Sequence, residues 1–292
     1  MFKGLMVVNA FLRTTKFDDL YHTLLDAAQQ CGMALDVVTN AELFCTVASE
    51  EFDPSAYDFV LFWDKDVQLA MQLENMGMRV FNSAQSILCC DDKALTYLKL
   101  KPYGIPMPRT ILAPKTFTNI GYPDLSFVDD VARTLGFPIV LKECFGSFGQ
   151  QVHLLHDPDS LRQKVQELAG SPMLFQELIS ESYGHDTRIN VVGGCVVASM
   201  LRRSTDGDFR SNLTRGGAME NYTPTEEEYA LAIRVTELLG LDFAGVDILF
   251  GKNGPILCEV NSNAHFKTTL QCTGVNMAVE IMRHIAGKLA EE

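Results

Sequence analysis

GVDIL (residues 245–249) and PILCEVN (255–261) are two short apolar runs, separated by the turn-forming sequence GKNG (251–254). Runs rich in Val, Ile and Leu on either side of such a turn predict the adjacent strands of a β-hairpin. Successive side chains of a strand point to opposite faces, so Glu259 and Asn261 are expected on one face. With Asp247 they supply three hard oxygen ligands, and buried carboxylates need a cation or hydrogen-bond donors. The hairpin predicts either a Mg²⁺ site shared with waters and a substrate phosphate, or a polar edge that faces water.

The composition is that of a globular protein with ample material for a core. The chain has 292 residues, 47% of them hydrophobic and 21% charged. No apolar run approaches the roughly 20 residues of a membrane span, and no secretory signal is expected at the N-terminus. A net charge of −13 argues against nonspecific binding to nucleic acid. The same acidity is also what ordinary solubility requires.

The eight cysteines are expected to be reduced thiols. Cys89 and Cys90 are adjacent, no CxxC occurs, and Cys144, Cys195 and Cys258 lie in or beside strand-like runs. This placement disfavours a structural zinc site and a disulfide framework. It is typical of a cytoplasmic protein.

Strands alternate with helices in roughly the first ninety residues. Apolar strands are predicted at residues 4–10, 34–38, 57–63 and 79–81, with helices at 17–31 and 66–76. Such alternation predicts a parallel, doubly wound sheet in a domain of residues 1–90. No GxGxxG turn is present, so a dinucleotide site is not supported.

The middle of the chain, residues 91–180, is predicted to be a two-layered α+β subdomain. Helices are expected at residues 92–103, 126–135 and 158–169, and strands at 138–142, 152–155 and 173–179. The loop GSFG (146–149) separates two of these strands, which are expected to pair in antiparallel fashion.

A second α+β subdomain is predicted for residues 181–292. Strands at 187–192 and 195–202 flank a Gly193-Gly194 turn. TPTE (223–226) has the pattern of a capping box with Pro at the first helical position, which predicts a helix ending near Leu239. The hairpin described above and a helix at 275–289 complete the chain.

Lys142 ends an apolar strand just before the loop GSFGQ (146–150). Glycine-containing loops can present backbone N–H groups to an anion, and a lysine at the base adds a positive charge. The loop is not a Walker A sequence, because GxxxxGK[ST] is absent. It is therefore either a phosphate-binding loop or a plain hairpin turn.

Five arginines precede the acidic hairpin on or beside predicted strands: Arg188, Arg202, Arg203, Arg210 and Arg215. Guanidinium groups clamp phosphate or carboxylate in a fork geometry. Arg188 and either Arg202 or Arg203 would lie on neighbouring strands, where they could converge. The alternative is a solvated face on which each arginine pairs with local acids. Cations beside a metal site favour phosphoryl transfer.

Several blocks of the sequence, in this order and spacing, resemble the ATP-grasp superfamily, and most closely RimK-like ligases of the α-L-glutamate type. The blocks are QELISE (176–181), GHDTR (184–188), VVGG (191–194), FRSNLTRGG (209–217) and the Asp247, Glu259, Asn261 set. The resemblance covers about residues 85–290. It implies an ATP-grasp fold, in which two α+β subdomains enclose ATP behind an N-terminal doubly wound domain.

The resemblance also implies roles for individual residues. Lys93 and Lys142 would approach the ATP phosphates, and Gly146, Ser147, Phe148 and Gly149 would form a lid over them. Gln176, Glu177, Leu178 and Ile179 would contact adenine, and Glu181 would hold the ribose. Asp247, Glu259 and Asn261 would bind two Mg²⁺ ions, with Mn²⁺ as a substitute. Arg188, Arg203, Asn212 and Arg215 would contact the γ-phosphate and the reacting carboxylate, and Arg215 would stabilise the tetrahedral intermediate.

The implied activity is ATP-dependent ligation of a carboxylate to an amine through an acylphosphate. It would add a glutamate-like amino acid to a peptide, a carrier protein or a small metabolite. Two alternatives remain: another ATP-grasp ligase, of the D-amino-acid or glutathione type, and a catalytically silent nucleotide-binding protein. Relatives of this kind are commonly homo-oligomers.

The sequence departs from the family pattern where the acceptor is expected. SNAHFK (262–267) replaces the common Ser-Pro-Gly, and Thr214 stands where a histidine is usual. His265 is either an acceptor contact or a surface residue without a role. Lys267, with Arg210 and Arg215, is the candidate basic patch for an acidic acceptor. The sequence leaves the acceptor itself open.

Overall fold

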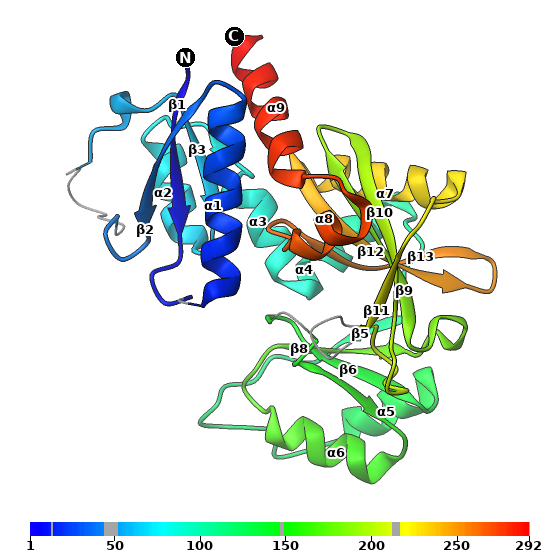
Figure 1. Cartoon of the computed structure of the whole chain (residues 1–292). Coiled ribbons are helices and arrows are strands. Elements are labelled where there is room, and N and C mark those ends of the chain that lie inside the picture. The colour runs from blue at the N-terminus through cyan, green and yellow to red at the C-terminus, as the bar shows by residue number, and fades with distance from the viewer. Residues whose placement is uncertain (13, 44–51, 147–148, 212–216, 292) are drawn as a thin grey trace.

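The computed structural model describes residues 1–12, 14–43, 52–146, 149–211 and 217–291. Within these residues the strands form three sheets, two of four strands and one of five. In Figure 1 the two sheets formed by the ends of the chain lie above, and the central sheet with its helices lies below them. No helix among the described residues is long and apolar enough to cross a membrane.

The N-terminal sheet is parallel, as predicted. Its strands run in the order β2 (Ala34–Thr39), β1 (Lys3–Val8), β3 (Phe59–Trp63) and β4 (Val80–Phe81), with α1 (Thr15–Gln30), η1 (Pro54–Ala56) and α2 (Val67–Asn75) between them in the chain. Alternate residues of β1 enter different cores, because successive side chains of a strand point to opposite faces. Met6 joins the cluster that contains α1, whereas Leu5 joins the cluster that contains α2. The sheet is therefore covered on both faces, which confirms the doubly wound prediction.

Two helices connect this sheet to the central one: α3 (Ala84–Asp91) and α4 (Lys93–Leu100), followed by η2 (Lys101–Tyr103). The sequence predicted one helix at 92–103; the structure adds α3 before it and ends the α-helix at Leu100. Cys89, Cys90 and Leu100 are buried in a cluster formed mainly by residues 189–260. These helices consequently pack on the C-terminal sheet.

The central sheet is antiparallel and has its own core. Its order is β5 (Thr110–Leu112), β8 (Met173–Glu177), β6 (Ile139–Glu143) and β7 (Val152–Leu155), with helices α5 (Ser126–Leu135) and α6 (Pro158–Glu167). β6 and β7 pair in antiparallel fashion across the glycine loop, as predicted. α5 and α6 cover one face with apolar residues such as Val131 and Leu161.

The C-terminal sheet is a five-stranded antiparallel layer. Its order is β11 (Ala218–Asn221), β10 (Cys195–Arg203), β9 (His185–Val192), β12 (Phe243–Gly251) and β13 (Gly254–Asn261), and it is accompanied by η3 (Ser180–Ser182), α7 (Glu226–Leu239), α8 (Lys267–Thr273) and α9 (Met277–Ala290). Both predicted hairpins are confirmed. The capping box is present but lies two residues later than predicted. Thr225, and not Thr223, caps α7 together with Glu228, so the helix begins at Glu226. Thr225 has an extended backbone, and its hydroxyl accepts from the N–H of Glu228 at 3.2 Å, as the cap requires.

The C-terminal helix packs back on the N-terminal part. In Figure 1 α9 runs beside α1, and one buried cluster combines Leu24 of α1 with Ile281 of α9. At the same junction Trp63 stacks on Phe243 with ring centroids 5.7 Å apart. These contacts fix the carboxyl edge of the parallel sheet beside the loop that follows β13.

The side chain of Asn82 ties the same junction together with hydrogen bonds. It is fully buried, and it donates to the carbonyls of Phe243 at 2.9 Å and Ser262 at 3.0 Å. Its oxygen accepts from the backbone N–H groups of Asp242 at 2.7 Å and Phe243 at 3.2 Å. One amide thus satisfies four backbone groups of the C-terminal sheet.

Candidate active site

A cavity of about 850 Å³ is lined by residues from all three sheets. Val140 of β6 and Gln176 of β8 line it from the central sheet, and Arg188 of β9 and Asp247 of β12 from the C-terminal sheet. Trp63 of β3 lines it from the N-terminal sheet. A cavity of this size, with polar groups converging where units meet, is the usual form of a small-molecule site.

The acidic hairpin contributes a β-bulge to this cavity. Asp247 pairs with Glu259, but the next residue, Ile248, pairs with Leu257, so Cys258 has no opposite partner. A bulge places two residues of one strand against one of the other and re-aims their side chains. Cys258 and Glu259 consequently both line the cavity, with Asn261 further along the strand. The hairpin therefore faces the cavity and not bulk water.

A buried cluster of two carboxylates and two guanidinium groups lies on the floor of the cavity. Arg188 forms a two-point pair with Asp247, in which Nη2 donates to Oδ2 at 2.7 Å. Nε and Nη2 of Arg202 donate to Oδ1 and Oδ2 of Asp186 at 2.7 and 2.6 Å. Nη2 of Arg202 also lies 3.0 Å from Oδ1 of Asp247. Burial alone would raise the pKa of Asp247, but Arg188 and Arg202 hold it below its ordinary value.

Two lysines were predicted to approach the phosphates; Lys142 lines the cavity, whereas Lys93 does not. Lys142 is 8% exposed; burial opposes its charge, yet Cys258, Tyr97, Glu259 and Asp247 together raise its pKa. Its Nζ lies 3.9 Å from the sulfur of Cys258. Lys93 is 7% exposed, and its Nζ donates to the carbonyl of Gly146 at 3.0 Å.

Arg210 anchors the glycine loop. Its Nη1 donates to the carbonyls of Gly149 at 2.7 Å and Val152 at 3.0 Å, while Asp208 accepts from its Nε and Nη2. This arginine is therefore committed to the loop and to Asp208, and is not presented as part of a basic patch. Gly146 and Gly149 line the cavity; Ser147 and Phe148 lie outside the described residues.

The segment at the end of β8 forms a further wall. Gln176, Glu177, Leu178 and Ile179 all line the cavity. β8 ends at Glu177, so the backbone beyond it leaves the strand ladder while still facing the cavity. Arg109 fixes this end: its backbone N–H and its Nε donate to Glu177 at 2.8 and 2.7 Å. Glu181 is exposed and accepts from Ser180 at 3.1 Å.

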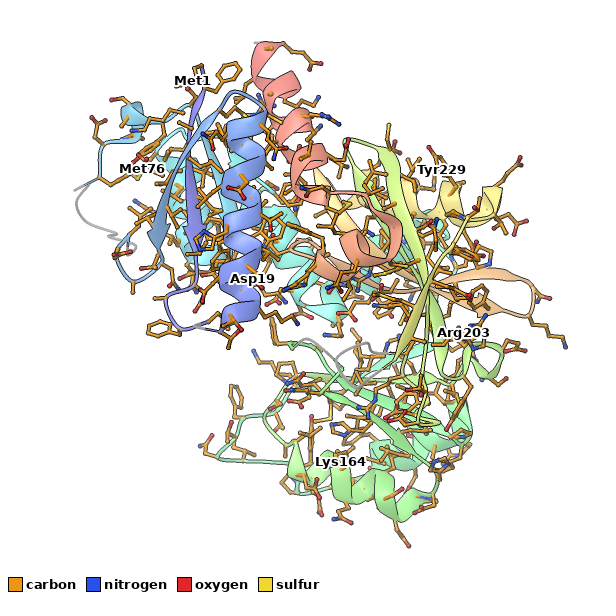
Figure 2. The ribbon with its side chains drawn as sticks, viewed as in Figure 1. Met1, Asp19, Met76, Lys164, Arg203 and Tyr229 are labelled. Carbon is orange, nitrogen blue, oxygen red and sulfur yellow. The ribbon has the colours of Figure 1, made fainter. Side chains whose placement is uncertain are left out.

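The structure divides the arginine candidates between the two faces of the C-terminal sheet. Arg202 lines the cavity, whereas the adjacent Arg203 is directed to the other face and lies 3.3 Å from Glu220. Figure 2 shows Arg203 on the far side of this sheet from α1 in that view. Arg202 thus occupies the position for which Arg203 was nominated. Asn212 and Arg215 lie outside the described residues.

The donor set fits a divalent cation that is shared with another ligand. Among the described residues no group of three His, Cys, Asp or Glu side chains could hold a metal ion. The hairpin offers two carboxylates and the amide oxygen of Asn261 as ligands. Nδ2 of Asn261 is a donor that is buried without a hydrogen-bond partner in the described chain, so it suits an anionic oxygen such as a phosphate oxygen beside the cation. An incomplete oxygen set is what Mg²⁺ uses when phosphates and waters supply its remaining ligands.

The N-terminal part supplies the far end of the cavity, which the sequence did not predict. Asn9, Tyr21 and Asp64 line it together with His265 and Lys267. Asn9 and Asp64 follow the carboxyl ends of β1 and β3, where ligands bind in open α/β sheets. That topological rule was the available signal, although the sequence lacks the glycine motif that usually marks a ligand site at this edge.

The two acceptor candidates occupy different surroundings. His265 is half-buried, its Nε2 lies 3.3 Å from the carbonyl of Lys16, and burial lowers its pKa to about 4. Lys267 donates to Asp19 at 2.5 Å. Figure 2 shows Asp19 near the end of α1 that lies toward the middle of the molecule. Arg210 and Lys267 are thus separately paired.

Comparison with known proteins identifies the family. A model of the RimK-like ATP-grasp domain matches residues 90–285. The uncharacterized protein MG012 homolog of Mycoplasma pneumoniae is 33% identical over 267 residues, which are 90% of this chain and 92% of that protein. N-acetylaspartylglutamate synthase A of Homo sapiens is 40% identical over 205 residues, 70% of this chain and 51% of that protein. The chain thus spans about half the length of that synthase.

Solved structures share the fold over the whole chain. The RimK domain ATP-grasp protein of Sphaerobacter thermophilus superposes with a TM-score of 0.75 at 22% identity, covering 97% of this chain and 98% of that chain. The predictions of an ATP-grasp fold and of a RimK-like ligase are therefore confirmed. This chain belongs to the RimK-like ATP-grasp family, and it is an ATP-grasp carboxylate–amine ligase.

Proposed function

We propose that this ligase joins a glutamate-like amino acid, through its amine, to the carboxylate of a peptide, a carrier protein or a small metabolite. The observation that carries the proposal is a single cavity that is lined by Lys142, Arg188 and Glu259 and also by residues of the N-terminal sheet. Such a cavity can hold ATP and the second substrate next to each other. The name of the human relative, N-acetylaspartylglutamate synthase A, supports a glutamate-containing product.

ATP would lie between the central and C-terminal sheets, as the family's use of ATP implies. We assign Gln176, Glu177, Leu178 and Ile179 to adenine, because their segment borders the cavity where the strand ladder stops. Glu181 stays a proposed ribose contact. Lys142 would approach the phosphates. Lys93 would act there by holding the carbonyl of Gly146 at the base of the glycine loop.

The family also uses a divalent metal, which we assign to Asp247, Glu259 and Asn261. We propose two Mg²⁺ ions, with Mn²⁺ as a substitute. When bound, they would neutralise the charge on the phosphate oxygens during phosphoryl transfer. Asp247 is paired with Arg188, so its coordination of a metal requires that this pair loosen or that one oxygen be shared.

The reaction that these residues support has two steps. A substrate carboxylate oxygen attacks the γ-phosphorus of ATP, and the bond to the bridging oxygen breaks, giving an acylphosphate and ADP. The amine nitrogen then attacks the acyl carbon, phosphate leaves with the electron pair, and the nitrogen loses its surplus protons as the amide forms. Arg188 and Arg202 would offset the negative charges that must meet, an electrostatic role that needs no acid–base pair. We place Arg202 in the role first suggested for Arg203, and Asn212 and Arg215 stay proposed contacts.

The decisive experiment is ADP release measured with both co-substrates present and with each omitted. L-Glutamate and other amino acids would be paired with small carboxylates and peptides, and product mass would identify the amide. We expect ADP only when both are present, whereas nucleotide binding without such turnover would favour a silent binding protein. A D-amino-acid product would favour the alternative ligase type.

A lysine pair provides the matched control for this assay. Lys142→Ala should lower turnover by about 100-fold or more, the cost of losing one charge that stabilises the transition state. Lys252→Ala removes the same charge from the exposed β12–β13 turn and should leave the rate unchanged. Equal rates for the two variants would contradict the assignment of Lys142.

Three further proposals accompany the function. The division into residues 1–90, 91–180 and 181–292 is supported by the three sheets, although the core between α1 and α9 joins the first and last parts. Assembly into a homo-oligomer is expected from the resemblance, and a cytoplasmic location is expected from the placement of the cysteines. Size measurement by light scattering tests the first of these two.

A further inference from the structure

Asp64 is a buried carboxylate at the carboxyl end of β3, and it forms no ion pair with the described residues. It is 6% exposed and lines the cavity. The neighbouring Lys65 turns its ammonium group to Asp91, and Lys267 is paired with Asp19. Both ammonium groups are thus paired with other carboxylates, and Asp64 forms no direct ion pair in the described part of the chain, although the charge of Lys65 still acts on it.

The hydrogen bonds around Asp64 are those of an ionised carboxylate. Nδ2 of Asn9 donates to its two oxygens at 3.1 and 3.2 Å, and the N–H of Lys65 donates at 2.7 Å. The Asn9 amide cannot be flipped without loss, because its oxygen accepts from the N–H of Phe11 at 2.9 Å. Every neighbour that bonds to the Asp64 carboxylate is therefore a donor.

Burial of an ionised carboxylate such as Asp64 costs free energy unless a cation pairs with it. Isolated burial of a carboxylate disfavours the charged form, and buried charges in proteins are paired or neutralised. Burial accordingly raises the pKa of Asp64, against the donors that lower it. A cationic ligand would remove this cost, and it would gain affinity from the same pairing.

Two further acceptors without donors lie in the same wall. Nδ2 of Asn263 donates to the carbonyl of Asp64 at 2.8 Å, which leaves its Oδ1 buried and without a hydrogen-bond partner among the described residues. The hydroxyl of Tyr21 is likewise buried without a partner in the described chain. Tyr21 feels the charge of Asp64, which adds to burial in raising its pKa to about 12.

This corner of the cavity adjoins the end that holds the candidate metal ligands. Asn263 follows Asn261 by two residues, so their Cα atoms are at most about 7 Å apart. A small molecule held at Asp64 would therefore reach the group that is transferred from the Arg188 end. Asp64 and Tyr21 lie outside the segment 90–285 that the family model matches, whereas Asn263 lies inside it.

We propose that Asp64, Tyr21 and Asn263 form an ammonium subsite for the amine-bearing substrate. Three acceptors, one of them charged, match the three N–H donors and the positive charge of an ammonium group. The subsite would select a free amino acid over the corresponding carboxylic acid and place its nitrogen beside the acyl group. The Asp64 carboxylate would accept one ammonium proton before the nitrogen attacks, and the second surplus proton would pass to water as the amide forms. The identification of its ligand as the amine substrate rests on the ligase function proposed above.

The subsite can be tested by binding, independently of turnover. Calorimetry would compare three pairs that differ in the amino group: L-glutamate and glutarate, L-aspartate and succinate, L-alanine and propionate. We expect the wild-type protein with bound ATP analogue to prefer at least one amino acid by about 10- to 100-fold, the worth of a charged hydrogen-bonded pair. Equal or undetectable binding of both members in all three pairs would overturn the proposal.

Two isosteric variants make the test specific. Asp64→Asn should abolish the preference and raise the KM for the amine substrate while the KM for ATP stays the same. Asp66→Asn removes the same charge two residues away, where the side chain caps α2 by accepting from Leu69, and should retain the preference. A preference that survives Asp64→Asn overturns the subsite. A preference lost in that variant, without ADP release by the wild type, would support the subsite and reject the ligase function.

Discussion

Replacing Arg202 with methionine would test the buried charge cluster on which the proposed phosphate end depends. Arg202 is 12% exposed in its side chain and holds Asp186 at 2.6 Å and Asp247 at 3.0 Å. With Arg188 the cluster contains two positive and two negative groups. Arg202→Met keeps much of the volume but leaves one buried negative charge without compensation.

The expected loss follows from breaking one side of a buried ion pair. Such changes cost about 3–5 kcal/mol, because the remaining charge stays desolvated. Unfolding entropy near 2.1 cal/mol/K per residue gives about 0.6 kcal/mol/K for this chain, so the melting temperature should fall by about 5–8 °C. The KM for ATP should rise as well, because the positive charge that faces the cavity is gone.

The neighbouring residue is a matched control. Arg203→Met removes the same charge from the same strand, but its side chain is 53% exposed and its partner Glu220 is 59% exposed. An exposed pair of this kind contributes about 0–1 kcal/mol. Calorimetric melting of both variants and ATP titrations measure this difference, and we expect a clear loss only for Arg202→Met. Equal melting temperatures, or a larger effect of Arg203→Met on ATP, would refute the reasoning.

Three other perturbations follow from the structure. Glu259→Gln should move the Mg²⁺ dependence of ADP release to at least about tenfold higher concentration, with little change in melting; an unchanged Mg²⁺ titration would exclude Glu259 as a ligand. Asn82→Ala removes the partner of four backbone groups, three of them in buried hydrogen bonds, and should cost about 3 kcal/mol in urea unfolding; a loss below about 1 kcal/mol would contradict the role given to these hydrogen bonds. Because Arg188 and Arg202 lower the pKa of Asp247 below 3.8, the unfolded chain binds its proton first on acidification. The stabilisation is therefore complete above about pH 4 and lost as the pH falls through the folded pKa, and Asp247→Asn should show a shallower acid loss than the wild type.

The strands and most helices could be predicted because their signals are local. The two hairpins of the C-terminal sheet follow from apolar runs interrupted by glycine turns, and both were confirmed. The order of polar blocks from Gln176 to Asn261 identified the family without any tertiary information. The helix start at Thr225 was missed by two residues, because Thr223 and Thr225 carry the same capping chemistry and only the backbone selects between them.

The bulge at Cys258 could not be predicted from the sequence. It arises where the register of β13 against β12 shifts, and it turns two consecutive side chains into the cavity. Which of Arg202 and Arg203 lines the cavity is likewise decided by strand pairing and not by the local sequence. Alternation shows that the two point to opposite faces, but the pairing of the whole sheet decides which face is enclosed.

The sequence by itself determined the fold class, the family and the acidic hairpin, because periodicity, turn residues and motif spacing act over short stretches of chain. Only the tertiary structure brought Asp64 and Asn9 against the loop that contains Asn263. Asp64 is 199 positions from Asn263 and Asn9 is further still, and their meeting depends on α9 packing on α1 and on Asn82 joining the sheets. Long-range burial, which no local pattern encodes, decided where the proposed subsite for the second substrate lies.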